Sequence, residues 1–224
     1  MGDVWQIGQK MSGDEFYNKA EKLPYPLKPM KDIIAANKLT CVCQAMLKTY
    51  NDIQEDQNEY LIEIEDINDE ISDIEGDLKA QIEKLEAEIT ELEIKKENGT
   101  ITEQEEAELA SKKSELGNLQ AQYENEIENS NKELDKTSDK AQNSEHKSKK
   151  EIATSYGKTA VNKGNELAST EDRTKTVLRR FFNSWSNADI REAGEKLAVS
   201  GSELLDKVGA CNEIDKKITE SKEK

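Results

Sequence analysis

Apolar residues recur at three- and four-residue steps from Leu39 to Leu92, and this repeat constrains the fold more than any other feature of the chain. Such steps place the residues on one face of an α-helix and, over many turns, form the seam of a coiled coil. Gln57 is the only clearly polar seam residue. The seam positions are Leu39, Cys43, Met46, Tyr50, Ile53, Gln57, Tyr60, Ile64, Ile67, Ile71, Ile74, Leu78, Ile82, Leu85, Ile89 and Leu92. The sequence therefore predicts one long helix.

A tight loop near residue 100 joins this helix to a second one. Gly99 or Asn98 can adopt the left-handed conformation that ends many helices, and Thr102 with Glu105 forms the capping-box pattern of a new helix. Because the stop and the start are so close, the two helices must run antiparallel. We predict an all-α fold: a long antiparallel coiled-coil helical hairpin, with helices of about 32–97 and 102–168, and additional C-terminal helices packing at its base.

The position of the loop also predicts which residues of the two helices face each other. Each position i should face a position near 200 − i, which pairs Leu92 with Leu109 and makes the distal half of the hairpin apolar on both sides. From residue 128 to 151, however, the only apolar side chains are Leu134 and Ala141. Residues of the first helix that face this polar stretch lack a partner. They are Ile53, Tyr60, Ile64, Ile67 and Ile71.

Half-exposed side chains of this size forgo on the order of 1 kcal/mol each, so another surface should cover these five residues. Three covers are possible: the C-terminal helices folded back, a second copy of the chain, or a different protein. We favour a copy or a foreign partner and assign the five residues to a protein interface.

The regions on either side of the hairpin have their own signals. Residues 1–31 hold all three prolines and form a flexible or wrapping N-terminal arm with a short helix from Gly13 to Lys22. Residues 169–224 form C-terminal helices, the last of which carries Gly194, Gly201 and Gly209 for close approach of a neighbour. An aromatic cluster in this region either packs against the base or forms a docking patch, and it joins the predicted interface. Its members are Phe181, Phe182 and Trp185.

Charge and composition limit the partners and the location. Residues 51–128 carry 26 acidic and six basic side chains, an excess larger than the net charge of −16 for the whole chain. This surface repels phosphate backbones, so we expect no nucleic acid partner. No apolar run is long enough to span a bilayer, and the start lacks the pattern of a cleaved signal peptide. We expect a protein that is cytoplasmic or exported without a cleaved signal peptide, and not an integral membrane protein.

No residue pattern indicates catalysis or cofactor binding. His146 is the single histidine and lies in a polar run, while three cysteines make no disulfide framework. The acidic run from Glu63 to Asp77 lacks the non-helical loop that a calcium site needs. We therefore expect no enzyme, no cofactor, no metal and no small-molecule substrate.

Two functions remain from the sequence. The first is a structural or interaction protein that self-assembles into a homo-oligomer through its coiled coil. One form of this hypothesis is a subunit of an exported filament or of a secretion tip or translocator assembly, which share this general build. The alternative is a cytosolic coiled-coil chaperone, tether or adaptor that binds a partner helix through residues 53–71.

Overall fold

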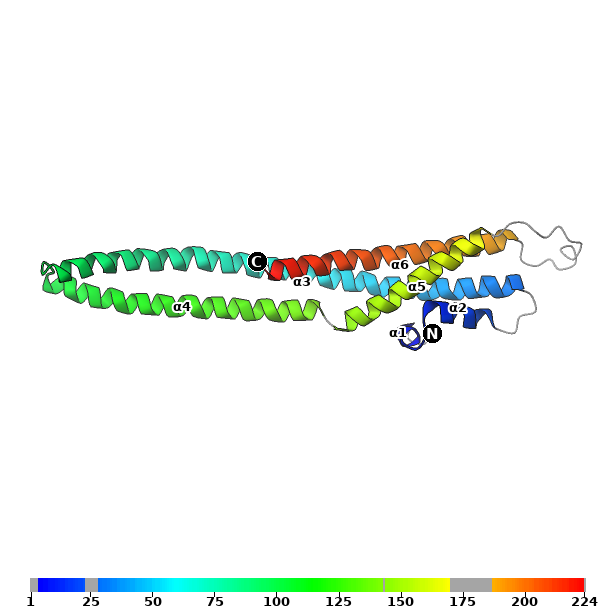
Figure 1. The fold of residues 1–224 in the computed structure, drawn as a ribbon, viewed down its shortest axis with the longest axis horizontal. Helices are drawn as coiled ribbons and strands as arrows, with labels where there is room; N and C mark the ends of the chain where they lie inside the picture. The colour runs from blue at the N-terminus through cyan, green and yellow to red at the C-terminus, as the bar shows by residue number, and fades with distance from the viewer. Residues whose placement is uncertain (1–3, 23–27, 143, 170–186, 224) are drawn as a thin grey trace, which may run out of the picture. The chain divides into compact units, whose positions relative to one another are not determined.

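The computed structural model describes residues 4–22, 28–142, 144–169 and 187–223, and these form helices and no strand (Figure 1). The all-α prediction is confirmed. The helices are α1 (Val4–Lys10), α2 (Gly13–Glu21), α3 (Lys28–Glu97), α4 (Glu103–Ala141), α5 (Ser144–Ala168) and α6 (Asn187–Lys222). The predicted aromatic cluster at residues 181–185 lies outside the described residues.

The chain divides into two compact units. Unit 1 comprises Met1–Asn58 and Gln142–Lys216, and unit 2 comprises Glu59–Ala141 and Lys217–Lys224. Helices α3 and α6 contribute to both units. The boundaries at residues 31 and 168 drawn from the sequence describe stretches of the chain rather than these units.

Unit 2 contains the predicted hairpin tip, in the predicted register. Lys112 Nζ lies 2.6 Å from Glu88 Oε2 and Lys95 Nζ lies 2.7 Å from Glu105 Oε1, and each pair joins positions whose numbers add to 200. Apolar residues around these pairs form one cluster. It contains Leu85, Ile89, Leu92 and Leu109, with Ile101, Leu116 and Leu119 packed against it.

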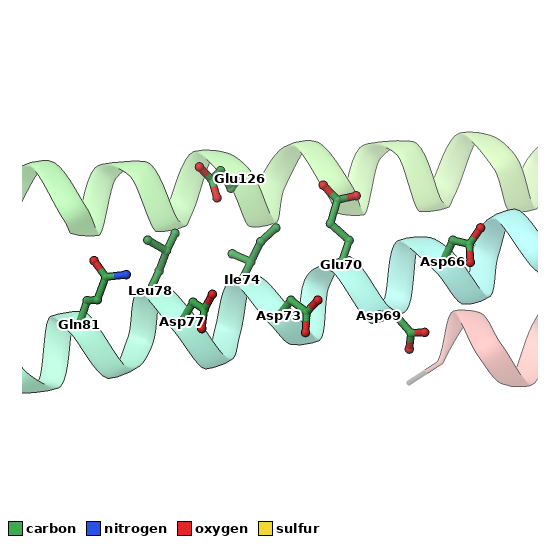
Figure 2. Close-up of a pocket in the computed structure, with 9 residues that line it drawn as sticks. All are labelled: Asp66, Asp69, Glu70, Asp73, Ile74, Asp77, Leu78, Gln81 and Glu126. Carbon is green, nitrogen blue, oxygen red and sulfur yellow. The ribbon is translucent and has the colours of Figure 1, made fainter.

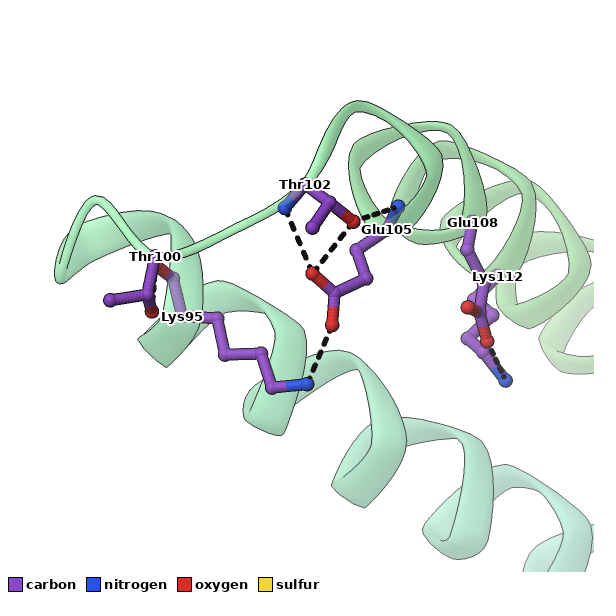
Figure 3. Close-up of polar contacts among 6 residues, drawn as sticks. All are labelled: Lys95, Thr100, Thr102, Glu105, Glu108 and Lys112. Carbon is purple, nitrogen blue, oxygen red and sulfur yellow. Dashed lines mark hydrogen bonds and ion pairs between the residues drawn. The ribbon is translucent and has the colours of Figure 1, made fainter.

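The turn at the tip uses the residues that the sequence singled out. Gly99 has a φ of 67°, its N–H donates to Lys96 O at 3.1 Å, and the N–H of Thr100 donates to Lys95 O at 2.9 Å. These two bonds make a Schellman motif. The backbone N–H of Thr102 donates to Glu105 Oε2 at 2.8 Å, while Glu105 N–H donates to Thr102 Oγ1 at 3.2 Å (Figure 3). Both helix ends therefore have hydrogen-bond partners.

Farther from the loop, the end of α6 packs against α3 and α4, so this part of unit 2 consists of three helices. The Asn68 amide donates to Ser221 O at 2.8 Å, and Thr137 Oγ1 on α4 donates to Glu63 Oε1 at 3.1 Å. Lys222 Nζ lies 3.0 Å from Asp135 Oδ1 and so connects α6 with α4. All three pairs of helices are thus in contact.

We call Ile53, Tyr60, Ile64, Ile67 and Ile71 the isoleucine stripe. The expectation that a copy of the chain or a foreign partner covers this stripe is not needed for its buried members, because the chain itself covers them. Ile64 is 0% exposed and Ile67 is 5% exposed in unit 2, while Ile53 is 5% exposed in unit 1. Tyr60 and Ile71 are half-buried. The C-terminal helices were one of the three possible covers, and the buried Ile218 of α6 adds apolar surface where α4 is polar, in place of the favoured copy or foreign partner.

Unit 1 packs α1 and α2 against α5. Gly13 N–H donates to Ser155 Oγ at 3.3 Å, Thr159 Oγ1 donates to Asp14 Oδ1 at 3.0 Å, and the buried Tyr156 donates its hydroxyl to Met11 O at 3.2 Å. The predicted helix that begins at Gly13 is confirmed. Residues 4–22 of the predicted N-terminal arm thus pack against α5.

Small residues bring α5 and α6 of unit 1 close together. A Cβ on Gly201 would lie 2.8 Å from Gly157 O, and one on Gly194 would lie 2.7 Å from Gly164 O. Real Cβ atoms do not come this near, so these positions need glycine. The predicted close approach is therefore found at two glycines but not at Gly209, where no described atom lies within 4 Å of a Cβ.

Two helix boundaries differ from those predicted. α3 begins at Lys28 rather than near residue 32, since Pro29 is compatible with the first turn of a helix. The return helix is not continuous over 102–168, because α4 ends at Ala141 and α5 begins at Ser144.

Two isoleucines on α3 test the burial of the stripe. Ile64→Ala should lower the free energy of unfolding by about 2–5 kcal/mol, because it leaves a cavity at a fully buried site. Ile62 is 58% exposed, so the matched change Ile62→Ala should alter it by no more than about 0.5 kcal/mol. Urea unfolding followed by circular dichroism measures both. Equal losses would show that the stripe is not covered.

The tip should become less stable in acid through one carboxylate. The hydrogen bond from Lys95, followed by those from Thr102, lowers the pKa of Glu105 from 4.5 to about 2. A depressed pKa means that the carboxylate stabilises the fold above pH 4.5 and loses this effect as the pH falls toward 2. In Glu105→Gln the thermal midpoint should fall at neutral pH and approach that of the parent chain in acid. Glu103→Gln, which removes a charge from the same turn, should not show this convergence.

Candidate protein-binding groove

The predicted interface residues that the structure describes do not form an open surface. Ile53, Ile64 and Ile67 are buried within the chain, and only the half-buried Tyr60 and Ile71 keep part of their surface in solvent. Their assignment to a protein interface stays a prediction, but it has lost the exposed stripe on which it was based.

Unit 2 has a shallow acidic hollow between α3 and α4. Ile74 and Leu78 point toward α4, whereas all the carboxylates except that of Glu126 are spread along α3, and Asp69 points away from α4 (Figure 2). Among the described residues, no group of three or more His, Cys, Asp or Glu side chains is arranged to hold a metal ion. The hollow is lined by Asp66, Asp69, Glu70, Asp73, Ile74, Asp77, Leu78, Gln81 and Glu126. Its carboxylates give this face a negative potential without forming a convergent site.

A second polar group lies inside unit 1. Gln57, the polar seam residue, is 1% exposed, and its amide donates to Asp215 Oδ1 on α6. Burial raises the pKa of the Asp215 carboxyl, while the positive charges of Lys150, His146 and Lys147 oppose this shift. A polar pair of this kind fixes the register between two helices, and nothing around it resembles a substrate pocket.

Another hollow, which is mostly apolar, lies between α1, α2 and α3 of unit 1. It consists of two adjoining parts of about 400 and about 290 Å³, and Ile7, Phe16 and Lys38 line both. The larger part is also lined by Val4, Ile34, Asn37, Cys41 and Val42, and the smaller part by Met11, Lys19 and Ala20. Both parts are open to solvent, so together they form a groove, which we call the N-terminal groove.

Trp5 and Gly8 of α1 pack against other helices and so hold the apolar side chains of Val4 and Ile7 at the groove. The Trp5 indole N–H donates to Thr49 Oγ1 at 3.4 Å, and its ring lies 6.1 Å from that of Tyr50. Gly8 faces Ile152 so closely that a Cβ would clash. These contacts fix α1 against α3 and α5, while Val4 and Ile7 remain half-buried in the groove wall.

α2 is held in the same way. Tyr17 is buried, and desolvation together with the nearby charge of Asp32 raises the pKa of its hydroxyl. The centroid of the Phe16 ring lies 5.8 Å from that of the Tyr156 ring, and Phe16 also lines the groove. The groove is thus built on anchored helices.

The cysteines differ sharply in exposure. Cys41 is exposed and lines the groove, whereas Cys43 and Cys211 are buried. Burial raises the pKa of the Cys43 thiol to about 12, and burial with the charge of Asp215 raises that of Cys211 to about 11. The groove therefore contains the accessible thiol.

Sequence reasoning missed this groove. α3 carries Ile34, Cys41 and Val42 at helical spacing beside the seam, so a second, shorter apolar stripe was visible. The sequence predicted the helix that starts at Gly13, but it did not predict α1 or the packing of the two short helices beside this stripe.

Comparisons with protein-family models, with curated proteins and with solved structures find no match for this chain. Within the described ranges, none of the helices is both long and apolar enough to cross a membrane. Inference about function therefore depends on the groove itself.

Thiol chemistry tests the groove directly. At about pH 8 a maleimide or disulfide reagent should modify Cys41 quickly, because only an accessible thiol can form the reactive thiolate. The two buried cysteines should react at the slow rate at which unit 1 opens. Cys41 and Cys43 lie in the same tryptic peptide, residues 39–48, so fragmentation of this peptide by tandem mass spectrometry identifies the modified residue. Fast modification of Cys43 would contradict the packing described here.

Proposed function

We propose that the chain is a non-enzymatic interaction protein, and that its N-terminal groove binds a helix of another protein. The observation that supports this most strongly is the groove itself: apolar side chains from three anchored helices stay partly exposed at one place. Apolar surface gathered in this way is typical of a protein-binding site.

The dimensions of the groove suit a helix. Its α3 wall extends from Ile34 to Val42, which is about 12 Å or two helical turns. An amphipathic helix can place its apolar face in such a groove and keep its polar face in water.

Of the functions inferred from the sequence, the groove favours the binding module, which includes chaperones, tethers and adaptors. Self-assembly through the isoleucine stripe has lost its main support, because α6 occupies part of that surface. The acidic hairpin of unit 2 suits a soluble spacer that repels other copies of itself.

Protection of Cys41 by model helices tests the proposal. Two peptides of about 18 residues, or five turns, share one Leu-rich apolar face and carry either Glu or Lys beside it. At least one of them should slow the alkylation of Cys41. Phe16→Ala should weaken that protection by about tenfold, because Phe16 lines both parts of the groove.

Val199→Ala is the matched control, since Val199 is 56% exposed on α6 and does not line the groove. Thermal melts verify that both variants fold. If neither peptide protects Cys41 at any soluble concentration, the groove does not bind helices and the proposal fails.

A further inference from the structure

We infer that the helix bound by the N-terminal groove is acidic, with carboxylates on both sides of its apolar face that pair with Lys19 and Lys38. This inference rests on the proposed function and adds the chemistry of the partner. It follows from the charges around the groove and from what the rest of the chain leaves exposed.

Both charged side chains that line the groove are lysines. Lys38 borders both parts and Lys19 borders the smaller one, and the described lining residues include no Asp or Glu. This local excess of positive charge occurs in a chain whose net charge is −16. Opposite charges across an interface increase the association rate and select the partner.

Carboxylates close to the groove in sequence are engaged elsewhere. Asp14 accepts a hydrogen bond from Thr159, and Glu15 accepts the backbone N–H of Ser12 at 2.8 Å. Asp32 is buried near Tyr17, whose pKa it helps to raise. These carboxylates keep their charge, but among the described residues none of them forms an ion pair with Lys19 or Lys38.

The structure also argues against the acidic hairpin of a second copy as the occupant. The apolar seam of the acidic hairpin is buried inside unit 2, where Leu85 and Ile89 lie in one cluster. Among the described residues, the large apolar side chains that are exposed on the hairpin are only Ile62 and Ile94. Single isoleucines on separate turns cannot fill a groove that is two turns long.

A fatty acid would satisfy the lysines but suits the shape less well. The groove is open along its length, so an acyl chain lying in it would keep one side in water. A helix covers its own apolar face against the groove and presents polar groups to solvent.

Charge exchange tests the inference. With wild-type chain, the Glu peptide should protect Cys41 at a concentration about tenfold lower than the Lys peptide. In the double variant Lys19→Glu, Lys38→Glu the preference should reverse, and the difference in both cases should shrink at high salt. Both lysines are exposed, so the variant should keep the melting temperature of the parent chain.

The matched control is Lys48→Glu with Lys158→Glu, which changes the same net charge at exposed sites of unit 1 outside the groove lining. It should retain the preference for the Glu peptide. Equal protection by the two peptides would overturn the inference while leaving the proposed function intact.

Two further outcomes would overturn it in other ways. Protection by oleate without protection by either peptide would identify a lipid site and would also refute the proposed function. Protection that grows with the concentration of the chain alone, together with oligomers in light scattering, would identify a second copy as the occupant.

Discussion

A mismatch between two antiparallel helices determines how this chain packs. α3 is apolar along its seam for many turns, but the stretch of the return helix near residues 128–151 offers little to cover it. α6 provides the missing surface: its end bonds to Asn68 on α3 and to Asp135 on α4, and Ile64 becomes fully buried. A hairpin that would otherwise need a partner is thereby completed by its own chain.

The same requirement shapes unit 1. Glycines at the α5–α6 contact let the two helices approach closely, and the pair Gln57–Asp215 joins α3 with α6. The Sγ atom of Cys211 lies 3.9 Å from the carbonyl oxygen of Tyr50, so α6 lies directly beside α3. With the seam of α3 occupied in this way, α1 and α2 pack on α5 and on the neighbouring face of α3, where the N-terminal groove forms. The groove therefore forms on a face of α3 outside the seam that α6 covers.

Sequence alone was sufficient for the parts that depend on local signals. Gly99 and the pair Thr102–Glu105 mark the loop, and once the loop is known the register follows, as the contact between Glu88 and Lys112 confirms. The cover of Ile64 could not be derived in this way, because it depends on a helix more than 100 residues away whose register has no short loop to fix it. The groove was missed for a related reason: its walls come from three helices, and each contributes only two or three apolar residues.

Removal of the end of α6 tests the central claim most directly. A chain that stops at residue 210 lacks Cys211, Ile214 and Ile218, so the stripe from Ile53 to Ile67 should become exposed. Sedimentation velocity should then show a monomer for the full chain and concentration-dependent oligomers for the shortened one. If the shortened chain stays monomeric with an unchanged thermal midpoint, α6 does not provide the cover and the account is wrong.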